Sequence, residues 1–287
     1  MDNDMVRILP ALLVSSLLAP LGTCVLAADD TPVAPEPAAS TPTPKKRMEI
    51  EGAIGPVFGV SPQYQGASKR NVTVTGGFFL RYGRYTISNT SAFVTRRKDD
   101  VFRGLGVDLK QSETIRTNLT LRFDHGRRSS NSEALHGLEN VRETIRGRAS
   151  LTRQFDHGNK GVVGWSPDLL GRGGGQTVDV GASHDRTIFP GFTWNIGGGL
   201  TWGDRRYMRS YYGVKPSETI SSGYPAYEPG SGLRDVSVGT TWRLDVDKRW
   251  VGFWGGSVTH LLGPAADSPL TQRKTLWSLN GGIAWRF

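Results

Sequence analysis

Hydrophobic and polar residues alternate one by one over most of the chain after Met48. In "IRTNLTLRF" (115–123) the odd positions are mostly apolar, and the even positions hold arginine, asparagine and threonine. The segments "FTWNIGGGLTW" (192–202) and "DVSVGTTWRL" (235–244) repeat the pattern. Because successive side chains of a strand point to opposite faces, each segment predicts a strand with one apolar and one polar face. We find no convincing helical period in this part of the chain.

Strand length and the placement of aromatic residues decide between two all-β folds. Strands of a soluble β-sandwich usually have about five or six residues, whereas strands that cross an outer membrane have about ten. Tryptophans lie near the strand ends, as at Trp194 and Trp202 or Trp277 and Trp285, where a membrane interface favours them. The pattern therefore predicts an all-β fold, a transmembrane antiparallel up-and-down β-barrel in the outer membrane of a Gram-negative cell.

The number of strands follows from parity. A barrel whose two ends both lie in the periplasm needs an even number, and the weak segment "GVVGWSPDLL" (161–170) supplies a twelfth strand, although Pro167 fits poorly within one. We expect twelve strands, with ten as the alternative. "TIFPG" and "DVDK" would be tight periplasmic turns, and 205–231 would be external. The expected strands lie near 49–58, 71–82, 84–95, 101–110, 115–123, 143–155, 161–170, 176–185, 192–202, 235–244, 248–262 and 277–287.

The first 47 residues differ from the rest. Residues 1–27 combine Arg7, an apolar stretch and small residues at Val25 and Ala27, which predicts a signal peptide. A lipoprotein site at Cys24 is the alternative, but Thr23 is a poor residue before a lipidated cysteine. Residues 28–47 are rich in proline, alanine and threonine, so we expect a disordered periplasmic tail. The barrel would then occupy residues 48–287, without a cysteine and without disulfides.

Charge indicates which partners an exported protein of this kind would meet. The chain has 35 lysines and arginines against 26 aspartates and glutamates, a formal net charge of +9. A basic exported protein favours anionic surfaces, so we expect outer-membrane lipid and lipopolysaccharide as partners and no nucleic acid.

Several arginines fall on the polar faces of the expected strands and would point into the lumen. Such side chains either select anions or pair with carboxylates such as Asp179 and Asp235 across a filled barrel, and the second interpretation is favoured because small barrels are filled by side chains. The candidate lumen residues are Arg116, Arg122, Arg146, Arg148, Asp235 and Arg243.

No motif predicts catalysis, a metal or a cofactor. "RFDHG" (122–126), "QFDHG" (154–158) and "SHDR" (183–186) are typical of turns, because adjacent Asp and His side chains of an extended chain point apart. "GRGGG" (171–175) is expected to be a flexible loop and lacks the strand-to-helix context of a phosphate cradle. Ser257 and His260 are the one pair considered for an outer-membrane hydrolase, and no orienting motif supports them. We therefore expect no enzyme, no catalytic residue, no metal and no cofactor.

The second half of the chain carries longer, more specific blocks. These are "YMRSYYGV" (207–214), "SGYPAYEPGSGLRDVSVGTTWRL" (222–244) and "LLGPAADSPLTQ" (261–272), and "GPVFGVSPQYQGA" (55–67) stands near the start. Their order and spacing resemble the MltA-interacting protein family, also called MipA/OmpV, over roughly 52–287. The loop residues that carry this resemblance are Tyr207, Tyr211, Tyr212, Gly213, Tyr224, Tyr227, Asp267, Ser268 and Pro269.

The resemblance implies a non-enzymatic outer-membrane barrel that acts as a scaffold, joining a lytic transglycosylase to a penicillin-binding protein during peptidoglycan growth. The alternative is a narrow channel or a solute-binding, porin-like protein. The tyrosines are expected to pack over the barrel mouth rather than bind a ligand, and Asp267 is expected to cap a rigid turn before Pro269. The final strand, with Trp285 and terminal Phe287, resembles the signal that the barrel-assembly machinery recognises.

Overall fold

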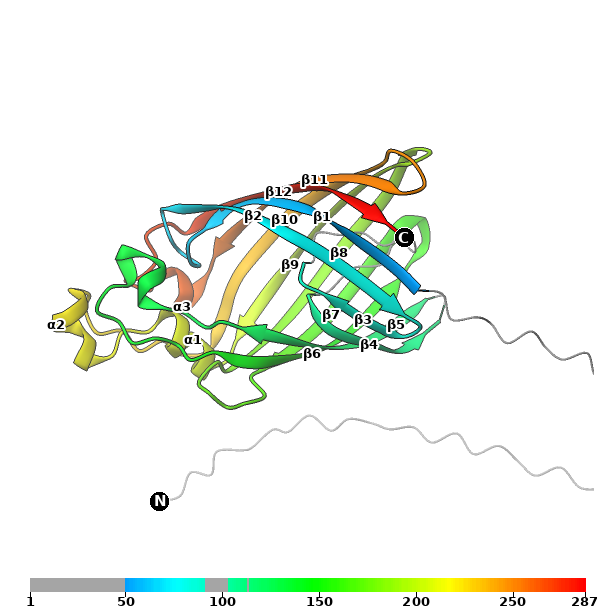
Figure 1. Ribbon diagram of the computed structural model, residues 1–287. Coiled ribbons are helices and arrows are strands. Elements are labelled where there is room, and N and C mark those ends of the chain that lie inside the picture. The colour runs from blue at the N-terminus through cyan, green and yellow to red at the C-terminus, as the bar shows by residue number, and fades with distance from the viewer. Residues whose placement is uncertain (1–49, 91–102, 113) are drawn as a thin grey trace, which may run out of the picture. The chain divides into compact units, whose positions relative to one another are not determined.

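The computed structural model describes residues 50–90, 103–112 and 114–287 (Figure 1). The chain divides into two units, Met1–Lys46 and Arg47–Phe287, and all described residues belong to the second. The predicted signal peptide (1–27) and tail (28–47) therefore lie outside the described residues, as do parts of the strands expected at 84–95 and 101–110.

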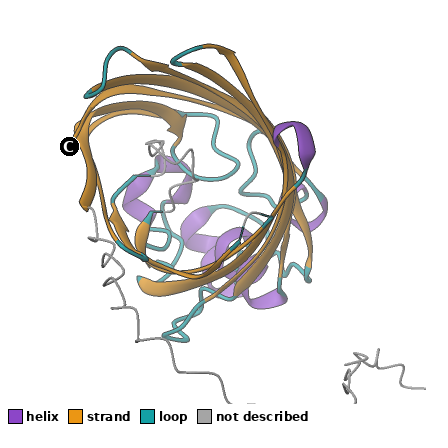
Figure 2. Cartoon of the chain, turned by 90° about the vertical axis from the view of Figure 1, so that its right-hand side faces the viewer, coloured by secondary structure: helices purple, strands orange, loops and turns teal. Residues whose placement is uncertain are grey.

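The described residues form twelve antiparallel strands that close into a barrel (Figures 1 and 2). Each strand pairs with its neighbours in the chain, and the last strand pairs with the first, so the predicted up-and-down barrel and its twelve strands are confirmed. The strands are β1 (Ile50–Pro62), β2 (Arg70–Tyr82), β3 (Tyr85–Ser88), β4 (Gly104–Gln111), β5 (Ile115–Asp124), β6 (Thr144–Gln154), β7 (Asn159–Pro167), β8 (Gln176–Phe189), β9 (Phe192–Gly203), β10 (Gly232–Asp245), β11 (Trp250–Leu261) and β12 (Thr275–Arg286).

The strand predicted with least support, β7, pairs along its whole length with β8, from Asn159↔His184 to Pro167↔Gln176. It begins two residues earlier and ends three residues earlier than the segment 161–170. Pro167 is its last residue, where a missing N–H costs the ladder least.

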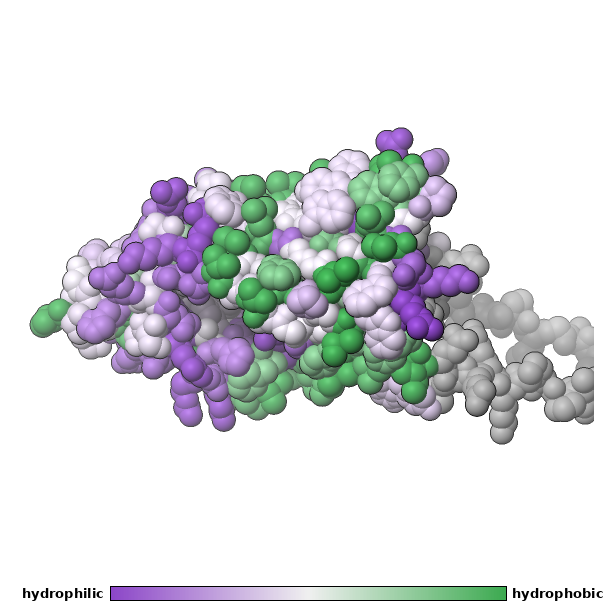
Figure 3. Space-filling view, turned by 45° about the horizontal axis from the view of Figure 1, so that its top comes forward, coloured by the Kyte–Doolittle hydropathy of each residue, from purple (hydrophilic) through white to green (hydrophobic). Residues whose placement is uncertain are grey.

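The two faces of the barrel wall reverse the usual polarity of a soluble protein. Large apolar side chains such as Phe58, Leu121 and Leu279 are exposed on the outside, whereas Asn118 and Arg243 are buried inside. Apolar side chains gather over the strands in the space-filling view, and hydrophilic ones gather over the loops at one end (Figure 3). An outward apolar band on a closed sheet without free edges is what lipid requires.

The barrel closes along β1 and β12, and the last residue extends this seam. The backbone N–H of Gly52 donates to the Phe287 carbonyl at 3.0 Å, and the Phe287 N–H donates to the Gly52 carbonyl at 3.0 Å. The Phe287 ring lies over Gly52, where a Cβ would come within 2.2 Å of it. Phe287 thus belongs to the closing seam through both its backbone and its ring.

The connections between strands differ in length at the two ends of the barrel. The end that carries the C-terminus, named here the short-turn end, has connections of two to four residues, namely 83–84, 112–114, 155–158 (with η3, Asp156–Gly158), 190–191 and 246–249. The described long connections at the opposite end, named here the cap, are 63–69, 125–143, 168–175, 204–231 and 262–274. The tight turns predicted at "TIFPG" and "DVDK" both lie at the short-turn end.

The cap contains short helices, which the alternating pattern did not predict. They are η1 (Ser129–Asn131), η2 (Glu133–Leu135), α1 (Arg205–Tyr212), η4 (Pro216–Glu218), α2 (Thr219–Ser222) and α3 (Gly263–Ala266). No convincing helical period was visible here because two turns of helix are shorter than the window in which a helical period is recognised. Within the described part of the chain, no helix has the length and apolar character needed to span a membrane.

A second correction concerns "SHDR", which was expected to be a turn. Residues 183–186 lie inside β8, which continues to Phe189. Ser183 and Asp185 face the lumen, and His184 faces outward with its Nδ1 3.0 Å from the Asn159 Oδ1. Of the two "FDHG" copies, only the second is a pure turn, with His157 in the left-handed region at φ 61°.

Candidate functional site: a capped lumen

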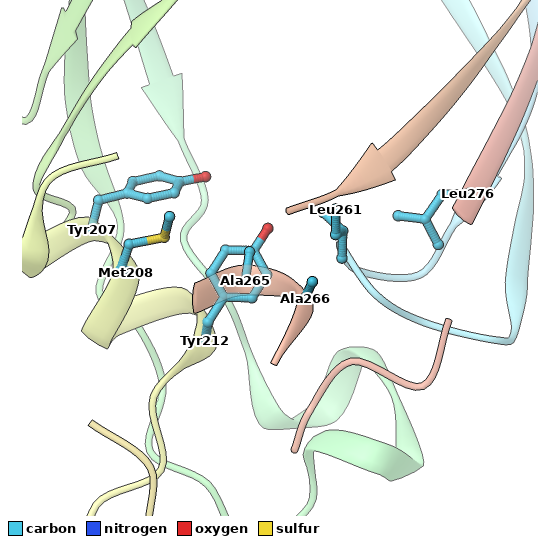
Figure 4. Packing of buried hydrophobic residues seen from close by; sticks show 7 residues of the cluster. All are labelled: Tyr207, Met208, Tyr212, Leu261, Ala265, Ala266 and Leu276. Atoms are coloured by element: carbon cyan, nitrogen blue, oxygen red, sulfur yellow. The ribbon is translucent and has the colours of Figure 1, made fainter. Parts of the chain in front are cut away.

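Helix α1 provides the centre of the cap. Asp204 begins the helix by accepting a hydrogen bond from the Tyr207 N–H at 2.7 Å. The helix buries Tyr207, Met208 and Tyr212 on one face, and its arginines point away. These side chains pack on residues from α3 and from the ends of β11 and β12 (Figure 4), the whole cluster being Tyr207, Met208, Tyr212, Leu261, Ala265, Ala266 and Leu276. The largest loop is therefore folded onto the barrel mouth.

A second cluster joins the connections 63–69 and 125–143 to 204–231 and 262–274. Leu135, Leu138, Val214 and Leu270 are buried together, with three tyrosines packed against them, Tyr64, Tyr224 and Tyr227. The Tyr64 hydroxyl donates to the Leu270 carbonyl at 3.0 Å, and the Tyr227 hydroxyl donates to the Pro264 carbonyl at 2.9 Å. Burial raises the pKa of Tyr64 to about 12, with a further contribution from Tyr224. The tyrosines thus pack in the cap.

The "DSP" element holds the cap together through a different residue from the one expected. Asp267 is exposed, ends α3 and forms an ion pair with Lys274 at 3.6 Å. The buried Ser268 hydroxyl instead donates to the Tyr212 carbonyl at 2.6 Å and accepts from the Leu270 N–H at 3.2 Å. Asp267 stands at the C-cap of α3, and the side-chain hydrogen bonds that fix the turn come from Ser268.

The glycine-rich loop 168–175 is tied down rather than free. Asp168 accepts hydrogen bonds from the Thr144 hydroxyl and from the Gly174 N–H. Burial alone would raise the pKa of Asp168, but these hydrogen bonds hold it below its ordinary value. The Arg146 guanidinium donates to the Gly174 and Gly175 carbonyls at 3.0 and 3.2 Å. The expectation of a flexible loop was therefore wrong, since its polar groups are satisfied by the wall beneath it.

The buried Arg127 connects two loops of the cap. The Arg127 guanidinium donates to the Tyr211 carbonyl at 3.1 Å and to the Glu139 carbonyl at 3.4 Å. Burial lowers the pKa of Arg127, and the nearby Glu218 acts against this. The Glu218 carboxylate in turn accepts from the backbone N–H groups of Glu139 and Lys215, both at 2.7 Å. This network fixes the loops 125–143 and 204–231 to each other.

Beneath the cap lies a cavity of about 1390 Å³ inside the barrel. The wall formed by β5 to β8 is charged, with Arg122, Arg146, Arg148 and Lys160 facing Asp124, Asp179 and Asp185. The wall formed by β9 to β12 carries small and neutral side chains, apart from Arg234 and Arg243, among them Asn195, Ser237, Ser257, Thr259 and Asn280. The lumen is therefore asymmetric in charge.

The candidate lumen arginines occupy different positions. Arg146 and Arg148 line the cavity and hold carboxylates, since the Arg146 Nε donates to the Asp124 Oδ2 at 2.9 Å and Arg148 binds both oxygens of Asp179 at 2.5 and 2.8 Å. Arg122 also lines the cavity and is exposed. The structure thus brings these three arginines together on two neighbouring strands.

The other candidates lie apart from this group. Arg243 reaches the cavity but is held by Asp245 on its own strand at 2.8 and 2.9 Å, and Asp245 also binds Arg286. Asp235 is buried and pairs with the adjacent Arg234 rather than with an arginine across the lumen. Arg116 is half-buried on β5 and is not part of the cavity lining.

Two important cavity residues were missed by the sequence reasoning. Asp124 was assigned to turn chemistry, although the alternation of β5 places it on the same face as Arg122 and would have identified it. Arg234 was missed because the pairing register shifts between Leu233 and Asp235, and this bulge turns Arg234 inward. Arg234 donates to the Tyr207 hydroxyl at 2.8 Å and so connects the wall to α1.

The hydrolase pair is separated by the barrel wall. Ser257 lines the cavity, whereas His260 lies on the outer face with its Nδ1 2.8 Å from the Thr275 hydroxyl. Because the two side chains point to opposite faces of β11, they form no dyad. Among residues 50–90, 103–112 and 114–287, no group of three or more His, Cys, Asp or Glu side chains is arranged to hold a metal.

Comparison with known proteins gives one specific match. The family described as "MltA-interacting protein MipA" matches residues 54–287, which include almost all of the barrel and its cap. No curated protein matches the sequence.

Solved structures of outer-membrane barrels are distantly similar. The "KdgM porin" has a TM-score of 0.36 and 8% identity, covering 83% of this chain and 99% of that chain. The "Anion-selective porin from Comamonas acidovorans" has a TM-score of 0.36 and 8% identity, covering 84% and 99%. OmpT, "an outer membrane protein of Vibrio cholerae", has a TM-score of 0.37 and 4% identity, covering 84% and 97%. Likenesses this weak carry no argument about function.

Proposed function

The chain belongs to the MltA-interacting protein MipA family, and from this premise we propose that it is a non-enzymatic outer-membrane scaffold for peptidoglycan enzymes. The proposed partners are a lytic transglycosylase and, through it, a penicillin-binding protein. The observation that carries the proposal is the family match, which spans residues 54–287 and so includes the wall, the short turns and the cap together.

The geometry supports a binding protein more than an open pore. The buried clusters of the cap cover the mouth, and buried charges such as Arg127 and Glu218 fix its loops. In outer-membrane barrels the long loops face outward and the short turns face the periplasm. We therefore propose that the short-turn end, together with the tail 28–47 that precedes the barrel, meets the peptidoglycan enzymes.

Crosslinked co-purification from native envelopes tests this proposal. The full-length protein is expected to capture a lytic transglycosylase. A variant lacking residues 29–47 is expected to capture less of it, because the tail is proposed to form part of the contact. Arg206→Gln, a change on an exposed cap residue far from the short turns, serves as the matched control and should capture as much as the wild type. Capture of abundant porins alone by the full-length protein would overturn the scaffold proposal.

The cavity favours a second candidate function, that of a narrow channel for small charged solutes. Its volume of about 1390 Å³ exceeds what side-chain packing in a filled barrel would leave. Single-channel recording in a planar bilayer tests this candidate. Discrete current steps that change in Arg243→Ala, with Arg116→Ala outside the cavity as the control, would support a channel. A silent bilayer for all three proteins would exclude it.

A further inference from the structure

The lumen carries more positive charge than its carboxylates balance. Eight basic side chains line the cavity in the described part of the chain, against three carboxylates. Two further carboxylates lie behind the lining, where Asp235 pairs with Arg234 and Asp245 pairs with Arg243. The eight basic residues are Arg103, Arg122, Arg127, Arg146, Arg148, Lys160, Arg234 and Arg243.

Most of these cations have assigned partners. Arg146 and Arg148 hold Asp124 and Asp179, and Lys160 forms an ion pair with Asp185 at 2.5 Å. Arg127 donates to two backbone carbonyls of the cap. These groups are therefore paired inside the protein, which leaves them less available to a ligand.

Arg122 differs from its neighbours. Its side chain is exposed to the cavity, and within the described ranges no ion pair or hydrogen bond joins it to another residue. It lies opposite Arg146 in the pairing of β5 with β6, and Arg148 is two residues further along the same strand. Three guanidinium groups thus share one patch of wall with two carboxylates, Asp124 and Asp179, which leaves one positive charge that an anion could balance.

The opposite wall offers a different chemistry. Strands β11 and β12 lie across the ring from β5 and β6 and present Ser257, Thr259 and Asn280 to the cavity. Hydroxyl and amide groups donate to and accept from the hydroxyls of an organic solute. A charged wall that faces a neutral, hydrogen-bonding wall suits a small molecule with one anionic end and one hydroxylated end.

We propose that the lumen beneath the cap binds a small hydroxylated organic anion, whose carboxylate or phosphate is held by Arg122. The inference deepens the second candidate function, because it names a ligand class for the lumen, but it requires neither conduction nor a peptidoglycan partner. Guanidinium groups suit both anions because their paired N–H groups match two oxygens of either group.

Isothermal titration calorimetry on the full chain in detergent micelles tests the proposal. The probes are glucuronate, inorganic phosphate and, as the uncharged counterpart, glucose. Wild-type protein is expected to bind glucuronate or phosphate saturably and to bind glucose far more weakly. The anion that binds more tightly distinguishes a carboxylate ligand from a phosphate ligand. Absence of saturable binding of both anions, or equal binding of glucose, would overturn the proposal.

Binding measurements on substituted proteins test whether Arg122 holds the anion. Arg122→Gln should weaken anion binding by about tenfold to a hundredfold, the loss expected for one charge-assisted hydrogen-bonding group. Arg122→Lys should keep more of the affinity than Arg122→Gln, and Arg172→Gln, on an exposed cap residue outside the cavity lining, should bind like the wild type. Heat-dependent gel migration confirms that each variant is folded. Wild-type affinity in folded Arg122→Gln would refute the assignment, whatever the outcome for capture of peptidoglycan enzymes or for channel current.

Discussion

Arg146 shows how a single residue links the barrel wall to the cap. Its guanidinium binds Asp124 on the next strand and the carbonyls of Ser166, Gly174 and Gly175. It is only 4% exposed, so all of its donors must be satisfied internally. The loop 168–175 is thereby held against the wall, and α1 packs above it.

Gly175 lies where the loop 168–175 meets α1, and there is no room for a side chain there. It has a positive φ of 57°, and a Cβ there would lie 2.2 Å from the Tyr207 backbone nitrogen at the start of α1. Gly175→Ala is therefore expected to loosen the cap by more than the about 1 to 3 kcal/mol of backbone strain alone. Gly171→Ala is the matched control, since Gly171 also has a positive φ, of 64°, but open space around it. Faster protease cleavage of the cap in Gly175→Ala than in Gly171→Ala checks the prediction, and equal rates would contradict it.

The raised pKa of Tyr64 predicts that the cap loses stability at alkaline pH. Its pKa is raised from 10.0 to about 12, so in this interval the unfolded chain has lost the phenol proton and the folded protein keeps it. The stabilising contribution of Tyr64 is therefore complete below pH 10 and is lost as the pH rises through about 12. An absorbance titration should show one phenol with a midpoint near 12 that is missing in Tyr64→Phe. Superimposable titration curves for the two proteins would contradict this.

For single residues, the sequence predicted which side of the barrel wall a side chain faces better than it predicted which residue that side chain pairs with. Strict alternation placed four arginines on the lumen side, because successive side chains of a strand point to one face or the other. They are Arg122, Arg146, Arg148 and Arg243. Pairing was less predictable, since Asp245 binds both Arg243 two residues away and Arg286 41 residues away. Such contacts depend on which strands meet when the barrel closes.

Among the elements, the strands were predictable and the cap was not. Each strand repeats one signal over eight or more residues, except for β3, which has four. Helix α1 has only eight residues, and its visible signal is Asp204 as a capping residue before two turns rich in arginine and tyrosine. Tyr207 and Tyr212 are buried at these helix and loop contacts, and Tyr211, Tyr224 and Tyr227 are half-buried there.

The closing seam of β1 and β12 gives a prediction at the scale of elements. Deleting Phe287 removes both backbone hydrogen bonds to Gly52 and the ring that covers it, whereas Phe287→Ala removes the ring alone. Both changes are expected to lower the amount of folded protein in the outer membrane, and the deletion should lower it further. Immunoblotting of membrane fractions with heat-dependent gel migration measures the effect. Normal levels of the truncated protein would contradict the proposed part of Phe287 in assembly.

In the whole molecule, the two ends of the barrel are built differently. The cap covers one end with buried clusters and paired charges, and the described part of the short-turn end consists of tight connections, the start of β1 and the C-terminus (Figure 1). Between them lies a cavity with one charged wall. The sequence predicted the barrel and its family, but a covered mouth above a basic cavity depends on how distant loops pack, and no local pattern encodes that packing.

Site-specific photocrosslinking in living cells tests whether the short-turn end and the tail meet peptidoglycan enzymes, as the proposed scaffold function requires. The photoreactive group is placed in turn at Ala38 in the tail, at Lys248 in the turn 246–249, and at Ile220, which is 98% exposed at the surface of the cap. The scaffold account predicts an adduct with a lytic transglycosylase from Ala38 or Lys248 and none from Ile220. Adducts from Ile220 alone, or no enzyme adduct from any of the three positions, would contradict it.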